Sequence, residues 1–280
     1  MNKKILIICR GGGDLATGIV HRLFRAGFPV LVLETDSPAA IRRQVSFSEA
    51  VYDGTATVEG VTAERIASAN RASVNHVLEE GRVPILVDPE GSSIPLLKPD
   101  IVVDAIIAKK NLGTAKEMAP LVIGVGPGFT AGEDVDLVVE SMRGHNLARI
   151  LETGSALANT GIPGNIGGYT KERVIHAAAE GYMKNLHQIG DVVQKGEEIA
   201  RIYEQMSPDG VFSGRFVSVE ATIPGVLRGL IREGYHFQKG FKIADIDPRE
   251  SELANCFTIS DKASSIGGSV LEAVCRYVNG

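Results

Sequence analysis

The sequence lacks any long apolar run. None of its hydrophobic stretches approaches the roughly 20 consecutive apolar residues that a membrane-spanning helix requires. Residues 1–4 lead directly into a short apolar run and a glycine turn, without the apolar core and small-residue cleavage site of a secretory signal. The sequence therefore predicts a cytoplasmic protein that makes no membrane contact.

Cysteines are few, and neither sign of charge dominates. Cys9, Cys256 and Cys275 are too few and too widely spaced for a disulfide framework or a zinc site, so no metal site is predicted. Cys9 precedes a glycine loop and is a candidate nucleophile, but burial as a small apolar residue is the favoured interpretation. With a net charge of −5 and interleaved charges, the chain offers no extended basic face to nucleic acid. A small molecule or a protein is the expected partner.

A chain of 280 residues favours two compact units. An apolar run at 5–8 predicts a buried strand, an apolar stripe at 14–26 predicts a helix, and a second strand follows at 30–33. The alternation continues, with a helix predicted over 63–80. We therefore predict an α/β fold in which residues 1–140 form a Rossmann-like nucleotide-binding domain around a parallel sheet.

An internal repeat with an offset of 44 residues marks the second half of the chain. Each copy has glycine turns, a Gln-Lys-Gly turn and an alternating strand, and resembles half of a biotinyl or lipoyl-type barrel-sandwich domain. We predict a glycine-rich polar connection at 141–177, a β-rich barrel-sandwich domain with two half-repeats at 178–248, and a C-terminal segment at 249–280 that packs back. The matched pairs include Gly181 with Gly225, Gly190 with Gly234, Gly196 with Gly240 and Ile202 with Ile246.

A glycine loop joins the first predicted strand to the first predicted helix. Its sequence fits the G-x-G-x-x-A form of the dinucleotide fingerprint, in which backbone N–H groups and the helix dipole attract a pyrophosphate. Glu34 follows Gly11 by 23 residues, near the spacing of a ribose-binding acid. Asp14 would repel a phosphate unless it points outward as an N-cap. The alternative is that the glycines only make a tight turn. The predicted ligand-binding residues here are Gly11, Gly12, Gly13, Asp14 and Glu34.

A second glycine loop, at 124–132, follows another apolar strand. Both loops leave the carboxyl ends of strands, where ligands bind in doubly wound sheets, so we expect them to converge on one crevice together with Glu34, Lys109 and Lys110. Lys109 and Lys110 also follow a strand and offer charge to a phosphate or a pterin-like anion, although a solvated pair is an equal alternative. The residues predicted to bind the cofactor at this loop are Gly126, Gly128 and Thr130.

A polar, glycine-rich stretch follows the last predicted strand of this half. Arg143 is suited to bidentate anion binding, and His145 to acid–base chemistry near neutral pH. These are the two catalytic candidates, with a structural role as the alternative. The stretch 159–164 has a similar composition.

Taken together, these segments resemble a known family. The series comprises 10–18, 126–132, 143–145, 159–164 and 245–249, and it resembles the accessory-protein family of the selenium-dependent molybdenum hydroxylase system. The first half is also similar to the Rossmann domain of the xanthine dehydrogenase and CO dehydrogenase maturation factors (the XdhC/CoxI group). The resemblance implies a maturation role, with the hydroxylase apoenzyme as partner and a nucleotide or molybdopterin dinucleotide as ligand.

Two other functions share these features. An NAD(P)-dependent oxidoreductase would use the same fingerprint, but it needs a proton-transfer group, for which His145 is the candidate. A biotin or lipoyl carrier would need a lysine in the hairpin between the repeats, and residues 203–210 contain none. The sequence does not determine the oligomeric state, and a homo-oligomer is one of the alternatives that stay open.

Overall fold

The computed structural model describes residues 5–158, 161 and 164–280, and these form two compact units. Unit 1 takes its residues from 1–38, 45–160 and 259–280, and unit 2 from 39–44 and 161–258. The chain is thus divided at 38, 44, 160 and 258, whereas the sequence places its boundaries at 140, 177 and 248.

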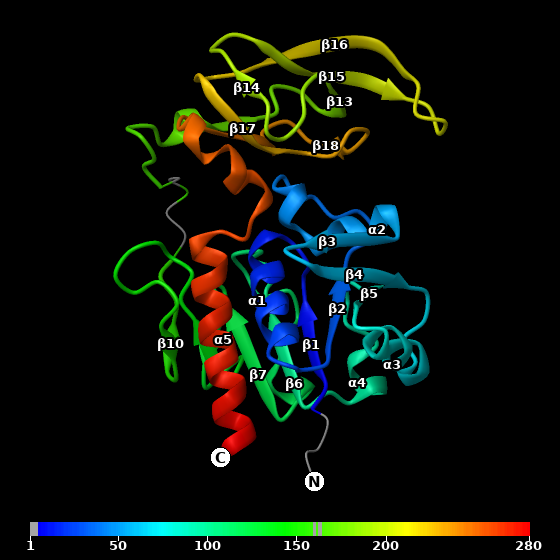
Figure 1. Ribbon diagram of the computed structural model, residues 1–280, viewed down its shortest axis with the longest axis vertical. Helices are drawn as coiled ribbons and strands as arrows, with labels where there is room; N and C mark the ends of the chain where they lie inside the picture. The colour runs from blue at the N-terminus through cyan, green and yellow to red at the C-terminus, as the bar shows by residue number, and fades with distance from the viewer. Residues whose placement is uncertain (1–4, 159–160, 162–163) are drawn as a thin grey trace. The chain divides into compact units, whose positions relative to one another are not determined.

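Unit 1 is built on a mixed sheet of nine strands in the order β10-β9-β7-β6-β1-β2-β5-β4-β3 (Figure 1). The strands from β9 to β4 pair in parallel, and β10 and β3 are added antiparallel at the two edges. The bounds are β1 (Ile7–Arg10), β2 (Val30–Glu34), β3 (Thr55–Val58), β4 (Val61–Ile66), β5 (Val83–Val87), β6 (Ile101–Asp104), β7 (Leu121–Val125), β9 (Leu137–Val139) and β10 (Ile150–Leu151). A small separate sheet pairs β8 (Thr130–Ala131) with β11 (Gly154–Ser155).

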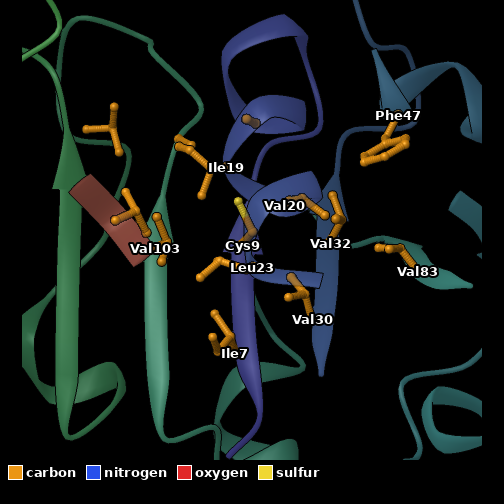
Figure 2. Close-up of a cluster of buried hydrophobic side chains, with 14 of the residues drawn as sticks. Ile7, Cys9, Ile19, Val20, Leu23, Val30, Val32, Phe47, Val83 and Val103 are labelled. Atoms are coloured by element: carbon orange, nitrogen blue, oxygen red, sulfur yellow. The ribbon is translucent and has the colours of Figure 1, made fainter. Parts of the chain in front are cut away.

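Helices cover both faces of this sheet because the central strands are apolar on both sides. Ile7 and Cys9 of β1 pack with α1 and α5, as Figure 2 shows for α1, whereas Ile8 points to the face covered by α3 and α4. Burial of each large aliphatic side chain contributes about 1.5–3 kcal/mol. The bounds are α1 (Asp14–Arg25), α2 (Ala50–Asp53), α3 (Arg71–Glu79), α4 (Ile94–Leu97), α5 (Asp261–Asn279), and the 3-10 turns η1 (Arg43–Val45), η2 (Phe47–Glu49) and η3 (Lys116–Met118).

The C-terminal helix α5 lies beside α1 and runs in the same direction (Figure 1). A Cβ atom at Gly18 would lie 2.7 Å from the Cβ of Ala263, so the two backbones approach closely. The Arg22 guanidinium donates to the Ser264 hydroxyl one turn further along. Both helices therefore begin at the edge of the sheet where the parallel strands end.

Unit 2 contains two four-stranded sheets, in the orders β12-β19-β17-β14 and β16-β15-β13-β18. The 44-residue offset relates β13 to β17, β14 to β18 and β15 to β19. Strands from different copies pair, β14 with β17 and β13 with β18, so neither copy forms a sheet by itself. The bounds are β12 (Val174–His176), β13 (Gly181–Asn185), β14 (Val192–Val193), β15 (Glu198–Met206), β16 (Phe212–Glu220), β17 (Gly225–Leu230), β18 (His236–Phe237), β19 (Lys242–Asp247), η4 (Lys171–Arg173) and η5 (Glu250–Phe257).

The predicted fold class, a Rossmann-like parallel sheet followed by a biotinyl/lipoyl-like barrel, was wrong. Unit 1 has a large mixed sheet, because β3 and β10 pair antiparallel at its two edges. The helix predicted from residue 63 starts only at Arg71, and residues 63–66 instead belong to β4 of the hairpin. Unit 2 is a β-rich region in which β12, β16 and residues 39–44 join the repeated strands. The molecule therefore combines a mixed-sheet α/β unit with a β-rich unit.

No helix in the described part of the chain combines the length and the apolar character needed to cross a bilayer. Most of the polar stretch 159–164 lies outside the described residues.

Candidate functional site

The two glycine loops of unit 1 lie on either side of one segment of chain. A Cβ atom at Gly11 would be 2.9 Å from the carbonyl oxygen of Ala105, and one at Gly128 would be 2.7 Å from the Cα of Lys110. Residues 105–110, which we call the lysine segment, are therefore held between the loops. Lys109 and Lys110 are both exposed there. The structure thus places the first glycine loop against the beginning of the lysine segment and the second glycine loop against its end.

The amino-terminal end of α1 faces open space beside this segment. Gly13 is the N-cap and, as a glycine, has no side chain with which to cap the helix. A Cβ atom at Gly13 would meet no described atom within 4 Å. Asp14 is the first helical residue and not the N-cap, so its carboxylate adds negative charge within the first turn. The helix start has the N–H groups and dipole that favour an anion.

Glu34, at the end of β2, contacts the first loop directly. One carboxylate oxygen accepts a hydrogen bond from the Gly12 N–H at 2.8 Å, and the other accepts from the Thr35 N–H at 2.7 Å. Burial raises the pKa of Glu34 above its ordinary value, although the two backbone hydrogen bonds oppose this shift. A ligand hydroxyl that donates to Glu34 would therefore share this carboxylate with the Gly12 N–H of the first glycine loop.

The second loop is fixed by contacts within unit 1. A Cβ atom at Gly126 would lie 2.6 Å from the Ser141 hydroxyl, so the loop lies directly on the end of β9. The Thr130 N–H donates to Asp134 at 2.9 Å, and its hydroxyl is 3.0 Å from that of Ser155. Thr130 thus supports the β8–β11 pair.

The two catalytic candidates have partners within the protein. Arg143 donates two hydrogen bonds to the Asp261 carboxylate, at 2.9 and 3.1 Å. The exposed His145 ring lies 3.2 Å from the Arg149 guanidinium. Arg143 therefore uses its bidentate geometry on a carboxylate at the start of α5.

Sequence reasoning missed Lys262, in the first turn of α5. Burial lowers the pKa of its ammonium group, and the positive charge of Arg143 lowers it further. The Ser260 hydroxyl accepts a hydrogen bond from the Ala263 N–H and caps this helix. A serine directly before a segment with helical apolar periodicity is the sequence signal that could have located the start of the helix. Negative charges around Lys262 oppose the shift, and they belong to Asp14, Glu140 and Asp261.

Comparison with known proteins gives one close similarity in sequence. The chain is 47% identical over 274 residues, 98% of its length, to the uncharacterized protein YqeB of Escherichia coli K12. It covers 48% of that protein, so it spans about half the length of the curated relative that it matches. No protein-family model matches the chain, and the predicted similarity to the XdhC/CoxI Rossmann domain is not shown.

Solved structures resemble the chain only distantly. The product-bound ectoine utilization protein EutE (DoeB) of Ruegeria pomeroyi is 12% identical, with a TM-score of 0.28, over 87% of this chain and 85% of that one. A succinylglutamate desuccinylase from Silicibacter sp. TM1040 is 12% identical, with a TM-score of 0.26, over 88% and 85%. An aspartoacylase family protein from Mesorhizobium loti is 8% identical, with a TM-score of 0.28, over 87% and 85%. Similarities of this size transfer no activity to this chain.

Chemically, the chain has groups that can bind an anion at this edge of the sheet. Among the residues that the structure describes, no cluster of three or more His, Cys, Asp or Glu side chains could hold a metal ion. Cys9 is fully buried, and burial raises the pKa of its thiol far above the ordinary value, so it is not a thiolate near neutral pH.

Proposed function

We propose that this chain is an accessory protein of a selenium-dependent molybdenum hydroxylase, and that it binds a nucleotide or a molybdopterin dinucleotide at the carboxyl edge of its mixed sheet. The observation that carries the proposal is the lysine segment, which lies between two glycine loops beside the open start of α1. The motif series that resembles the accessory-protein family, together with the similarity to YqeB, supports the maturation role.

The proposed contacts follow from charge and geometry. A pyrophosphate at Gly13 would accept hydrogen bonds from the first N–H groups of α1, and the dipole of such a helix contributes about 0.3–1 kcal/mol at an exposed site. Lys109 and Lys110 would supply positive charge, since ammonium groups bind phosphates as point charges. The Glu34 carboxylate would accept a hydrogen bond from a hydroxyl or N–H group of the ligand. It would then serve both the ligand and the Gly12 N–H, from which it already accepts.

An NAD(P)-dependent oxidoreductase is the second candidate, favoured by the spacing of Gly11 and Glu34. Such an enzyme needs a proton-transfer group beside its substrate. The candidate His145 is exposed and lies against Arg149, and Arg143 is engaged with Asp261. These contacts favour a binding role over turnover.

Native mass spectrometry of freshly purified protein tests the ligand. We expect a co-purified mass that matches a nucleotide or a pterin dinucleotide, and the same spectrum reports whether the protein is a homo-oligomer. A spectrum of ligand-free protein, with no mass shift on addition of nucleotides, would contradict the binding proposal.

Elemental analysis of the partner enzyme tests the biological role. In a strain that lacks this protein, we expect the hydroxylase to be folded but inactive and depleted in molybdenum, selenium or both. A full complement of both elements with normal activity would contradict the maturation role and favour an independent dehydrogenase. Arg143→Ala and His145→Ala variants returned to that strain should restore activity if both side chains act only within the fold.

A further inference from the structure

A buried polar network lies beneath the lysine segment. Arg10 ends β1 and Asp104 ends β6, and the two residues are register partners in neighbouring strands. Both are only 2% exposed, as is Thr114. The Thr114 hydroxyl accepts a hydrogen bond from the Arg10 guanidinium and donates one to the Asp104 carboxylate at 2.6 Å. One hydroxyl thus connects an arginine and a carboxylate whose nearest charged atoms are 3.8 Å apart.

This network holds the lysine segment at its beginning and just beyond its end. The second oxygen of Asp104 accepts from the Ile106 N–H at 3.1 Å. The Arg10 guanidinium also donates to the carbonyl of Leu112, at 3.4 Å. Burial raises the pKa of Asp104, while the bonds from Thr114 and Ile106 and the charge of Arg10 oppose the shift. A buried polar group costs free energy unless it makes its hydrogen bonds. Because moving the lysine segment would break hydrogen bonds of this buried network, the network fixes the backbone that it contacts.

The backbone between these contacts has an uncommon conformation. Ile107 has a φ of 60° and Lys109 a φ of 64°, in the left-handed region that residues other than glycine rarely adopt. For the β-branched Ile107 this is a true outlier, and such conformations persist only where the surroundings impose them. Gly128 closes the segment from the other side, against the Lys110 backbone.

We infer that Arg10, Asp104 and Thr114 are positioning residues that fix Lys109 and Lys110 for the phosphate groups of an anionic ligand. The inference rests on the proposed function, because it needs a phosphate-bearing ligand at this edge. The network touches no ligand itself. It acts through the backbone of the lysine segment, whose two ammonium groups meet the phosphates.

The test uses the full chain and inorganic pyrophosphate as the probe, in calorimetric titrations at low salt. Thr114→Val removes the bridging hydroxyl but keeps the shape, and we expect about tenfold weaker binding together with faster amide hydrogen exchange at 106–112. Thr114→Ser keeps the hydroxyl and should bind within about twofold of the unchanged protein. Thr57→Val removes an exposed threonine hydroxyl on β3 and is the matched control. If Thr114→Val does not fold, Asp104→Asn carries the same expectation.

A double-mutant cycle separates positioning from a general structural role. Because Thr114 acts through the lysines, Thr114→Val should weaken binding little further in a protein that already carries Lys109→Gln and Lys110→Gln. Fully additive losses, or unchanged affinity and exchange in Thr114→Val, would overturn the inference while leaving the proposed function standing. If the unchanged protein fails to bind pyrophosphate at all, the proposed function falls and the inference with it.

Discussion

Two repeat-related glycines of unit 2 and the N-cap glycine of α1 in unit 1 differ in the space around their Cβ positions. In unit 2, a Cβ atom at Gly225 would lie 2.2 Å from the carbonyl oxygen of Asp247, and one at the repeat-related Gly181 would lie 2.4 Å from that of Tyr203. In unit 1, a Cβ atom at Gly13 would meet no described atom within 4 Å. Close backbone approach thus explains Gly181 and Gly225, whereas Gly13 has neither a close neighbour among the described residues nor a positive φ and lies where we propose that a phosphate binds.

The buried carboxylates of the two units differ in the direction of their pKa shifts. Burial alone would raise the pKa of Asp247 in unit 2, but hydrogen bonds and charge from Arg249, aided by the charge of Arg228, hold it below the ordinary value. In unit 1, burial raises the pKa of Glu34 and Asp104 despite their hydrogen bonds. At Asp247 the pairing with arginine therefore outweighs burial, whereas at Glu34 and Asp104 burial outweighs the hydrogen bonds, so the charged form of these two carboxylates is disfavoured. Perturbed groups of that kind gather at functional sites.

The largest expected effect is on the stability of the repeat. Gly225→Ala should lower the free energy of unfolding by about 4 kcal/mol, of which about 2 come from the clash with the Asp247 carbonyl and about 2 from the strained backbone. Urea unfolding at pH 7 measures this loss. Gly240→Ala is the matched control, because Gly240 also has a positive φ but faces open space, and it should cost about 1–2 kcal/mol.

Equal losses at Gly225 and Gly240 would mean that close backbone approach does not explain the repeat glycines. The contrast between the crowded Gly225 of unit 2 and the open Gly13 of unit 1 would then have no energetic basis.

The second effect depends on pH. The folded pKa of Asp247 lies below its unfolded value of about 3.9, so its contribution to stability is present above pH 4 and is lost as the pH falls through the folded pKa. Asp247→Asn should cost about 2 kcal/mol at pH 7, where the charged hydrogen bonds from Arg249 are lost. Unfolding curves of variant and unchanged protein should converge as the pH falls below 4.

A difference that stayed constant from pH 7 to pH 3 would show that the Asn side chain perturbs packing and not the ion pair. Asp36→Asn, at an exposed position, is the control and should stay within about 0.5 kcal/mol.

Local sequence patterns predicted much of unit 1 but not its edges. The run at β2 and the stripe of α1 were placed to within one residue, and the strand predicted at 5–8 lies at 7–10, because burial on one or both faces leaves a direct periodic signal. The hairpin of β3 and β4 was missed, since a short turn at Glu59 and Gly60 carries little periodicity and the residues after it were assigned to a helix. Edge strands are set by tertiary pairing, and so the mixed character of the sheet could not be predicted.

The candidate site was predictable to the extent that it follows strand ends. The glycine loops and the lysine segment all come after parallel strands, and topology alone predicts that they share an edge. Lys262 could not be placed there, because its position depends on the packing of α5 against α1 at Gly18. The network of Arg10 and Thr114 joins residues 104 positions apart, a pairing that no local pattern signals.

The smallest effect on stability, and the sharpest on binding, is expected at Gly13. Its φ of −70° and ψ of −175° suit a β-branched residue, and the space around its Cβ position is open, so Gly13→Val should cost no more than about 1 kcal/mol through the poorer N-cap. The added methyl groups would fill the space proposed for a phosphate, and affinity for inorganic pyrophosphate should fall about tenfold, or about 1.4 kcal/mol.

Gly268→Ala, at another open glycine in α5, is the control: it should raise stability by about 1 kcal/mol and leave affinity unchanged. Calorimetric titration with circular dichroism as the folding check measures both quantities. If Gly13→Val binds pyrophosphate as well as the unchanged protein, the glycines of the first loop serve only the turn between β1 and α1, and the contrast with unit 2 loses its functional meaning.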